Sequence, residues 1–360
     1  MTENELNSIL GAVRPADSAA AARAARRQAE LAKPPGSLGK LEDISIRMAG
    51  ITGSVINEIE SCRVLVFCAD NGVAKEGVAV TPQSVTLMQA INMTRRITGM
   101  SALAKYFGCS VTVVDVGIDC PVTPDGIVNK KVRQGTSSIL RGPAMTRAEA
   151  LSAFEAGYET AMKAHADGCD IVGVGEMGIG NTTTSAAVLA ALLGLPAEEV
   201  TGRGSGLTDE AFALKKRVVA EARKANSPDG GDVMDVLSKV GGLDICAMAG
   251  AFVGAASCRM PAVVDGFISI VAALCAVRLC PAVRDFIFLS HASMERGYRR
   301  AAEALGLEPF LLLDMRLGEG SGCPIAFEVI KAACAAMRGM ATFSEAAIDD
   351  AYLDEIRKRP

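Results

Sequence analysis

Two glutamates in this 360-residue sequence stand in glycine-rich segments, where a carboxylate could take part in catalysis. Glu176 lies in the segment GVGEMGIGNTTT and Glu319 in the segment RLGEGSG. Neighbouring glycines leave room for a ligand, and a cleft that excludes water raises the pKa of a carboxylate toward the range of a general base. The alternative is a pair of solvated loop carboxylates, which are common on protein surfaces.

The first of these segments also has the pattern of a phosphate-binding loop. Gly178 and Gly180 let the backbone approach a ligand, and the N–H groups at the start of the next helix favour an anion. Three hydroxyl residues that can cap that helix or bind the anion follow: Thr182, Thr183 and Thr184. A second segment of glycine and hydroxyl residues, TGRGSGLTDE, adds Arg203 and Ser205. Two such loops favour a monophosphate site over helix capping alone.

Other catalytic patterns have weaker support. GVGEMG matches the G-x-G-x-x-G dinucleotide fingerprint, but the required acid about 20 residues later would fall in the helix-end turn LPAEEV. Two alternative functions stay open at this point. One is a nicotinamide-dinucleotide oxidoreductase, and the other is a nucleotide-binding protein without enzymatic activity. The sequence has no P-loop, H-E-x-x-H or G-x-S-x-G pattern, and its acids indicate no metal site. His291, in SHASMERG, fits either a ligand contact or a buried hydrogen bond.

The elements that must position these segments alternate between strands and helices. Six continuous apolar runs are typical of strands buried on both faces of a parallel sheet. They are RVLVFCAD (63–70), SVTVVDVG (110–117), DIVGVGE (170–176), PAVVDG (261–266), DFIFLSH (285–291) and PFLLLDM (309–315). Helices are predicted between them, for example at residues 85–106, 147–165, 209–226 and 267–279. This order predicts an α/β fold with a doubly wound, mainly parallel six-stranded sheet that binds ligands at the carboxyl ends of its strands.

Both ends of the chain lack strand-like runs. Residues 3–30 contain an Ala-rich helix, and residues 324–357 contain two helical segments. We expect residues 1–40 and 324–360 to form a small helical subdomain and residues 41–323 to form a large α/β catalytic domain.

Composition excludes several classes of protein. The net charge is -4, tryptophan is absent and only 4% of the residues are aromatic, which argues against nucleic-acid binding. No apolar span is long enough for a membrane helix, and the first ten residues, MTENELNSIL, lack the pattern of a secretory signal. The eleven cysteines form no C-x-x-C or zinc pattern, which is typical of buried, reduced thiols. We therefore expect a cytoplasmic protein.

Seven segments are distinctive when taken together. They are KPPGSLGKLE (33–42), ADNGVAKEGVAVTPQSVTLMQ (69–89), VGEMGIGNTTTSAA (174–187), TGRGSGL (201–207), GGLDICAMAGAFVGAA (241–256), VVDGFIS (263–269) and LDMRLGEGSG (313–322). In this order they resemble the nicotinate-nucleotide:dimethylbenzimidazole phosphoribosyltransferase family over nearly the whole chain. The resemblance implies a large Rossmann-like domain, a small helical domain from both termini, a homodimer, and no cofactor or metal.

The resemblance also implies a reaction and a set of site residues. 5-Phosphoribose would pass from nicotinate mononucleotide to 5,6-dimethylbenzimidazole, giving α-ribazole 5'-phosphate and nicotinate for the nucleotide loop of cobalamin. Glu319 would take the N–H proton of the acceptor, and Glu176 would contact the nucleotide. The implied pocket for the acceptor base consists of Thr81, Gln89, Met177 and Leu317. The implied phosphoribosyl site consists of Gly178, Gly180, Asn181, Thr182, Thr183, Arg203, Gly204, Lys215 and Asp265.

One departure and one open point accompany this resemblance. The chain has Asn71 in DNG where many relatives have D-H-G, so no catalytic role is carried over to that side chain. The pyridinium leaving group is already activated, so the implied reaction needs neither a metal nor a protonating acid. We expect residues 178–184 to bind the anion and Glu176 to face the ribose, where its charge favours a cationic C1'. The physiological acceptor stays open, because adenine, other benzimidazoles or phenols also fit such a pocket.

Overall fold

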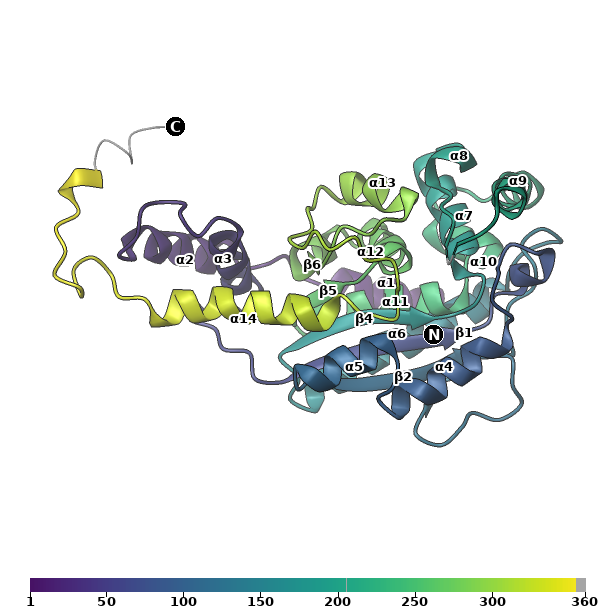
Figure 1. Ribbon diagram of the computed structural model, residues 1–360, viewed down its shortest axis with the longest axis horizontal. Coiled ribbons are helices and arrows are strands. Elements are labelled where there is room, and N and C mark those ends of the chain that lie inside the picture. Colours follow the sequence, from purple (N-terminus) through teal and green to yellow (C-terminus); the bar gives the residue numbers. More distant parts are fainter. Residues whose placement is uncertain (205, 354–360) are drawn as a thin grey trace.

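A parallel six-stranded sheet forms the centre of the protein (Figure 1). The structure is a computed structural model that describes residues 1–204 and 206–353. The strand order is β3-β2-β1-β4-β5-β6. The strands are β1 (Cys62–Ala69), β2 (Ser110–Gly117), β3 (Val128–Asn129), β4 (Ile171–Met177), β5 (Ala262–Val264) and β6 (Ile287–Leu289). The predicted α/β fold with a six-stranded parallel sheet is confirmed.

The sheet differs from the prediction at one strand. Residues 309–315 form no strand, although Leu311 makes one isolated parallel bridge with His291. Leu312 and Leu313 in this run are exposed, so its apolar character does not come from burial in the sheet. The strand that replaces it is β3, an exposed edge strand of only two residues. Such a strand is too short to leave a hydrophobic pattern in the sequence.

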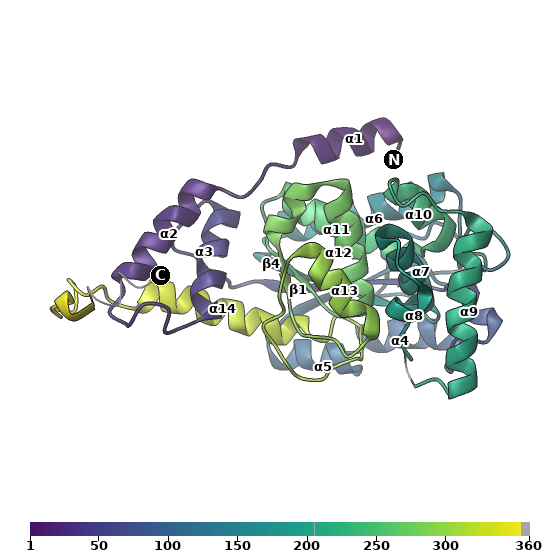
Figure 2. The same cartoon turned by 90° about the horizontal axis from the view of Figure 1, so that it is seen from above.

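Helices cover both faces of the sheet (Figures 1 and 2). One face carries α6 (Arg147–Ala166), α11 (Leu243–Ser257) and α12 (Phe267–Leu279). The other carries α4 (Ser84–Thr94), α5 (Gly99–Tyr106) and the first part of α14 (Cys323–Gly339). The single helix predicted at residues 85–106 is thus two helices, because Arg96 has a left-handed backbone and Thr98 caps α5.

The remaining helices lie around this core. They are α1 (Glu3–Ala12), α2 (Ser18–Glu30), α3 (Lys40–Thr52), α7 (Asn181–Leu193), α8 (Ala197–Val200), α9 (Asp209–Asn226), α10 (Val233–Val240) and α13 (Arg296–Leu305), with 3-10 turns η1 (Gly72–Glu76), η2 (Pro281–Phe286) and η3 (Ala351–Leu353). Helices α7 to α10 pack together beside the carboxyl ends of the central strands. Within the described residues, no helix is both long enough and apolar enough to cross a membrane.

Segments from both termini form a helical group beside the sheet. Helices α2 and α3 pack together, and the second part of α14 lies against α3 (Figure 1). Ala24, Ala49 and Met337 form the small core of this group. The division into residues 1–40 plus 324–360 and residues 41–323 stays a prediction, although α3 begins at Lys40 and packs with the terminal helices. Beyond α14 the only helical segment described is the short turn η3, and residues 354–360 lie outside the described part.

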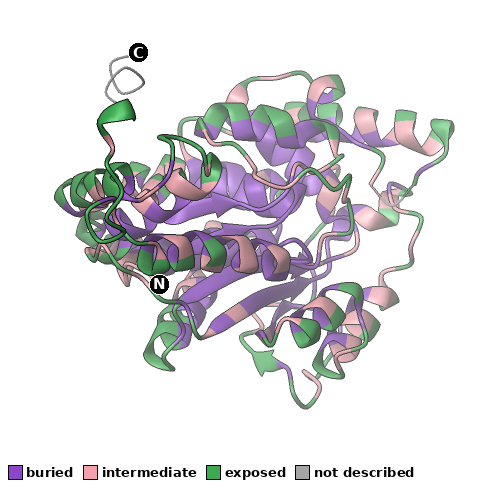
Figure 3. Ribbon diagram, turned by 60° about the vertical axis from the view of Figure 1, so that its left-hand side comes forward, coloured by how far each residue is buried: buried purple, intermediate pink, exposed green. Residues whose placement is uncertain are grey.

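The core lies between the central strands and the inner faces of their helices (Figure 3). The closest helix contact joins α6 and α11, where glycines replace side chains. A Cβ atom at Gly157 would lie 1.7 Å from the carbonyl oxygen of Ala247, and one at Gly250 would lie 1.9 Å from that of Phe154. Because the neighbouring atoms belong to the backbone, they cannot move aside. The two helices therefore approach closely only with glycine at these positions.

We predict that Gly157→Ala lowers the free energy of unfolding by about 1–3 kcal/mol or more, because the added methyl group overpacks the interface between α6 and α11. Urea denaturation measures this change. Gly11→Ala is the control, because nothing lies near Gly11 in the exposed helix α1 and alanine is the better helix former. Equal stability of Gly157→Ala and the wild type would contradict the packing argument.

Candidate active site

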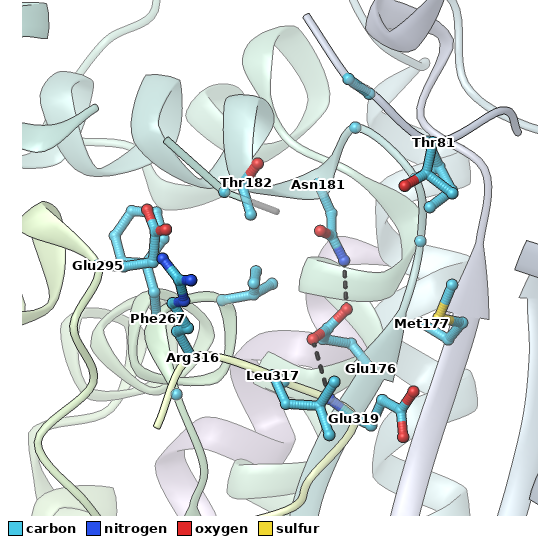
Figure 4. Close-up of a pocket in the computed structure, with 18 of the residues that line it drawn as sticks. Thr81, Glu176, Met177, Asn181, Thr182, Phe267, Glu295, Arg316, Leu317 and Glu319 are labelled. Carbon is cyan, nitrogen blue, oxygen red and sulfur yellow. Dashed lines mark hydrogen bonds between the residues drawn. The ribbon is translucent and has the colours of Figure 1, made fainter. Parts of the chain in front are cut away.

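A cavity of about 260 Å³ opens at the carboxyl ends of the central strands (Figure 4). Its walls come from the end of β4, the start of α7, the segments before α4 and α9, the loops after β5 and β6, and the loop before α14. All but two of the sequence-predicted site residues line it: Thr81, Gln89, Glu176, Met177, Gly178, Gly180, Asn181, Thr182, Arg203, Gly204, Lys215, Leu317 and Glu319. The fold thus brings these distant segments together.

The loop that carries Glu319 has an unusual backbone. Gly318, Glu319 and Gly320 have φ angles of 82°, 63° and 86°, in the left-handed region that favours glycine. Such a conformation costs about 1–3 kcal/mol at a residue with a side chain, so the surroundings must enforce it. The Asp265 carboxylate does so by accepting hydrogen bonds from the N–H groups of Gly320 (3.0 Å) and Gly322 (2.7 Å).

Glycines in β4 let this loop lie directly against the sheet. A Cβ atom at Gly175 would lie 2.5 Å from the backbone nitrogen of Gly320, and one at Gly173 would lie 2.4 Å from Cβ of Cys323. Two of the glycines in the apparent dinucleotide fingerprint therefore accommodate protein backbone and side chain. They make room for the Glu319 loop rather than for a dinucleotide.

The two glutamates meet in the cavity. The N–H of Glu319 donates to Oε1 of Glu176 over 3.4 Å (Figure 4). The Glu319 carboxylate accepts from Nε2 of Gln89 at one oxygen and from the backbone N–H of Met100 at the other, each over 3.2 Å. Met100 lies in the first turn of α5, whose N-terminus favours a negative charge. Glu319 is therefore held as an oriented hydrogen-bond acceptor at the cavity wall.

Glu176 is the penultimate residue of β4 and is almost completely buried. Burial, and next the nearby Asp244 carboxylate, raise the pKa of Glu176 from 4.5 to about 8. A hydrogen bond from the Asn181 amide acts in the opposite direction. Without a ligand at neutral pH, Glu176 therefore carries a proton much of the time, and a cationic ligand would favour its ionised form.

The opposite part of the cavity holds cationic side chains together with one carboxylate, that of Glu295. The Lys215 side chain is buried, and its Nζ donates to Oγ1 of Thr182 over 2.7 Å. Burial lowers the pKa of Lys215 to about 8. A phosphate beside this amine would raise its pKa again, and the first turn of α7 adds partial positive charge. Arg203 lies at the same wall, where its guanidinium pairs with Asp209 over 2.5 Å.

Two site residues predicted from the family do not line the cavity. Thr183 faces the core because it is one position past Thr182, and adjacent residues of a helix point about 100° apart. Asp265 is buried beneath the Glu319 loop, where its oxygens accept backbone hydrogen bonds. The expected capping by the threonines is also wrong. Helix α7 begins after Gly180, with no side-chain hydrogen bond to the cap.

The sequence did not determine the roles of His291 and Asn71, and the two side chains have different surroundings. His291 lines the cavity, and its Nδ1 lies 3.0 Å from Oγ of Ser290. Burial lowers the pKa of His291 to about 4, so the ring is neutral at physiological pH. Asn71 is completely buried outside the cavity, where its Oδ1 accepts a hydrogen bond from Thr184 over 3.0 Å.

Sequence reasoning missed several residues of the cavity wall. Arg316 and Glu295 lie at the end away from Glu319, near Phe267 (Figure 4). Arg316 belongs to RLGEGSG, which was considered because of Glu319. Glu295 belongs to SHASMERG, which was considered because of His291. The position of these segments after strand-like runs was the available signal. It did not indicate which of their side chains point inward.

We predict that Glu176→Gln weakens the pH dependence of stability. The folded-state pKa of about 8 lies above the ordinary value of 4.5, so the stability from the bound proton is present below about pH 4.5 and lost as the pH rises to about 8. The unfolding temperature of Glu176→Gln, minus that of the wild type, should therefore increase between pH 5 and pH 8.5. For a chain of this length, each kcal/mol corresponds to about 1–2 °C.

Differential scanning calorimetry without ligand measures these temperatures. Glu210→Gln is the control, because Glu210 is exposed near the start of α9 and its replacement should leave the pH dependence as in the wild type. Parallel curves for Glu176→Gln and the wild type would show that Glu176 does not titrate in this range.

Comparisons with known proteins agree with this arrangement. A family model described as a phosphoribosyltransferase matches residues 13–348. The nicotinate-nucleotide–dimethylbenzimidazole phosphoribosyltransferases of Clostridium perfringens and Clostridium tetani are 51% and 46% identical to the chain, each over 98% of both chains. The crystal structure of the enzyme of that name from Thermus thermophilus has a TM-score of 0.88 and 40% identity, and covers 92% of this chain and 99% of the other. The chain therefore belongs to the nicotinate-nucleotide–dimethylbenzimidazole phosphoribosyltransferase family.

Proposed function

We propose that this enzyme transfers 5-phosphoribose from nicotinate mononucleotide to 5,6-dimethylbenzimidazole, giving α-ribazole 5'-phosphate and nicotinate for the nucleotide loop of cobalamin. The observation that carries the proposal is the polarity of the cavity. Two hydrogen-bonded carboxylates, Glu176 and Glu319, lie in one part, and Lys215 with Thr182 lies in another. A substrate with a cationic glycosidic nitrogen and an anionic phosphate matches both parts.

The phosphate of the nucleotide would bind between the start of α7 and Lys215. Gly180 and Thr182 belong to this wall, and a Cβ atom at Gly204 would lie 3.5 Å from Nζ of Lys215. Backbone N–H groups, a hydroxyl and an ammonium group are the donors that phosphates prefer. Fixing the phosphate would place the sugar toward the carboxylates.

The acceptor base would lie beside Glu319, with Met177 and Leu317 as apolar walls and Thr81 and Gln89 as polar ones. Its unprotonated ring nitrogen attacks C1', and the bond from C1' to the pyridinium nitrogen breaks. The electron pair of that bond stays on nicotinate, which leaves as a neutral pyridine ring. The proton on the other azole nitrogen passes to the Glu319 carboxylate. Attack from the face opposite the leaving ring converts the β nucleotide into an α nucleotide.

Glu176 would face the sugar during this step. As the glycosidic bond lengthens, C1' and the ring oxygen gain positive character, which an adjacent carboxylate stabilises. In the ground state the pyridinium cation already favours the ionised form of Glu176, despite its raised pKa. The negative charge is therefore useful near C1', at a distance from the phosphate.

We also propose a homodimer in the cytoplasm. Apolar side chains are exposed around the cavity and in the leucine-rich run before it, among them Met88, Met294, Leu312, Leu313 and Leu317. Exposed apolar groups of this kind mark contact surfaces, which supports a second copy of the chain as the partner. The free thiols, of which only Cys258 is not classed as buried among the described residues, support a reducing compartment.

The direct test of the function is incubation of the protein with nicotinate mononucleotide and 5,6-dimethylbenzimidazole, followed by chromatography. Equimolar nicotinate and α-ribazole 5'-phosphate should form. Binding of the nucleotide without release of nicotinate would indicate a nucleotide-binding protein without this activity. Reduction of a dinucleotide instead would indicate an oxidoreductase.

We predict that Glu319→Gln lowers turnover by about 10²- to 10⁴-fold, because the amide cannot accept the azole proton. The fold and the affinity for nicotinate mononucleotide should be retained, as measured by calorimetry. Glu328→Gln, on the part of α14 outside the cavity, is the control and should keep wild-type turnover. Wild-type turnover of Glu319→Gln would exclude Glu319 as the base.

We predict that Lys215→Met raises the KM for nicotinate mononucleotide by about 10- to 100-fold, the loss expected for a charge-assisted hydrogen bond. Lys216→Met is the matched control, because Lys216 lies over the ring of Phe212 and does not line the cavity. The riboside without phosphate should react equally with Lys215→Met and the wild type. A larger loss with the riboside would mean that Lys215 binds another part of the substrate.

A further inference from the structure

A buried carboxylate, Asp244, lies directly behind the cavity wall, and the proposed reaction gives it no part. It is the second residue of α11, is completely buried and does not line the cavity. A Cβ atom at Gly178 would lie 2.8 Å from Oδ2 of Asp244. The wall between this carboxylate and the cavity is therefore the backbone of one glycine.

The amide of Asn181 connects Asp244 to Glu176. Its Nδ2 donates one hydrogen bond to Oε2 of Glu176 (Figure 4). It donates a second to Oδ2 of Asp244 over 3.1 Å. An amide nitrogen carries two hydrogens, so both are used. Rotation of the amide by 180° would place its oxygen against two carboxylates. The pair of carboxylates thus fixes the orientation of the amide.

Asp244 is itself held in place. Nδ2 of Asn71 lies 3.5 Å from Oδ2 of Asp244, and the hydroxyl of Thr184 donates to Oδ1 of Asn71 over 3.0 Å. A Cβ atom at Gly242 would lie 2.4 Å from Oδ1 of Asp244, so the other side of the carboxylate is packed against backbone. Neither the carboxylate nor the Asn181 amide has room to turn.

We propose that Asp244 is a positioning residue for the transfer reaction, which acts through the Asn181 amide to hold the Glu176 carboxylate toward the sugar. The inference rests on the proposed function, in which Glu176 faces C1'. Asp244 touches neither substrate. Its effect is on the direction of one hydrogen bond and on the charge that surrounds Glu176.

The charges around Glu176 determine the direction in which its ionisation should shift when Asp244 or Asn181 is replaced. Glu176 is faced by Asp244 on α11, by Asp265 after β5 and by Glu319 before α14, and it lies near the Cys68 thiol on β1. The cations that line the same cavity are Lys215, Arg203 and Arg316. The Asp244 charge raises the pKa of Glu176, and the hydrogen bond from Asn181 lowers it. Removing the charge and removing the amide should therefore shift the ionisation of Glu176 in opposite directions.

The test compares Asp244→Asn, Asn181→Ala and the double variant by nicotinate release between pH 5.5 and pH 9. Each single variant should lose about 10- to 100-fold in kcat, with the KM for nicotinate mononucleotide nearly unchanged. The acid limb of kcat/KM should move to lower pH in Asp244→Asn and to higher pH in Asn181→Ala. The double variant should be no slower than Asn181→Ala, because Asp244 acts through the amide.

Asp115→Asn is the matched control. Asp115 is a fully buried aspartate near the end of β2 that pairs with Lys131 over 3.0 Å and does not line the cavity. This variant should keep the wild-type acid limb. Circular dichroism and calorimetric titration with nicotinate mononucleotide show whether each variant is folded.

Wild-type turnover with an unmoved acid limb in Asp244→Asn would overturn the proposal, as would shifts of both single variants in the same direction. So would a double variant whose loss is the product of the two single losses. If Asp244→Asn does not fold, a wild-type profile of Asn181→Ala still overturns the proposal, and a raised acid limb with lowered kcat supports it. Failure of the proposed function differs from all of these, because the wild-type protein would then release no nicotinate.

Discussion

The contact between the Glu319 loop and β4 is the constraint on which the rest of the site depends. A side chain at Gly175 would meet the backbone of Gly320, so only glycine lets the loop approach the strand. Once it is there, the N–H of Glu319 reaches the Glu176 carboxylate, and two glutamates far apart in the chain face one cavity. The left-handed backbone at Glu319 is maintained because Asp265 accepts two hydrogen bonds from the loop.

The electrostatics of the cavity follow from this crowding. Burial raises the pKa values of Glu176, Asp265 and Asp244 to about 8, 7 and 6, so Glu176 is the one of the three that is mainly protonated at neutral pH in the free protein, and a cationic substrate would ionise it. Across the cavity, burial lowers the pKa of Lys215 to about 8, and a phosphate would reverse that shift. Substrate binding would therefore favour the charged form of both groups, and this couples binding to the charge distribution that the transfer requires.

Much of the fold and of the site could be predicted from the sequence. Long buried strands such as β1 and β2 have continuous apolar runs. The glycine segments at the end of β4 and after residues 309–315 indicated where ligands bind. The family resemblance supplied residue roles that spacing alone left open. The prediction of a strand at residues 309–315 was wrong, because exposed leucines give the same sequence pattern as buried ones. The position of Asp265 beneath the loop could not be predicted, because an acid beneath a loop and an acid facing a ligand look alike in sequence, and only packing distinguishes them.

The most direct test of the account is a crystal structure of the protein with α-ribazole 5'-phosphate bound. The account predicts a Glu319 carboxylate oxygen within about 2.6–3.2 Å of the outer benzimidazole nitrogen, Glu176 beside C1', and the phosphate between Lys215 and the start of α7. A product whose phosphate lies beside the two glutamates, or whose outer nitrogen is bound by another side chain, would contradict it.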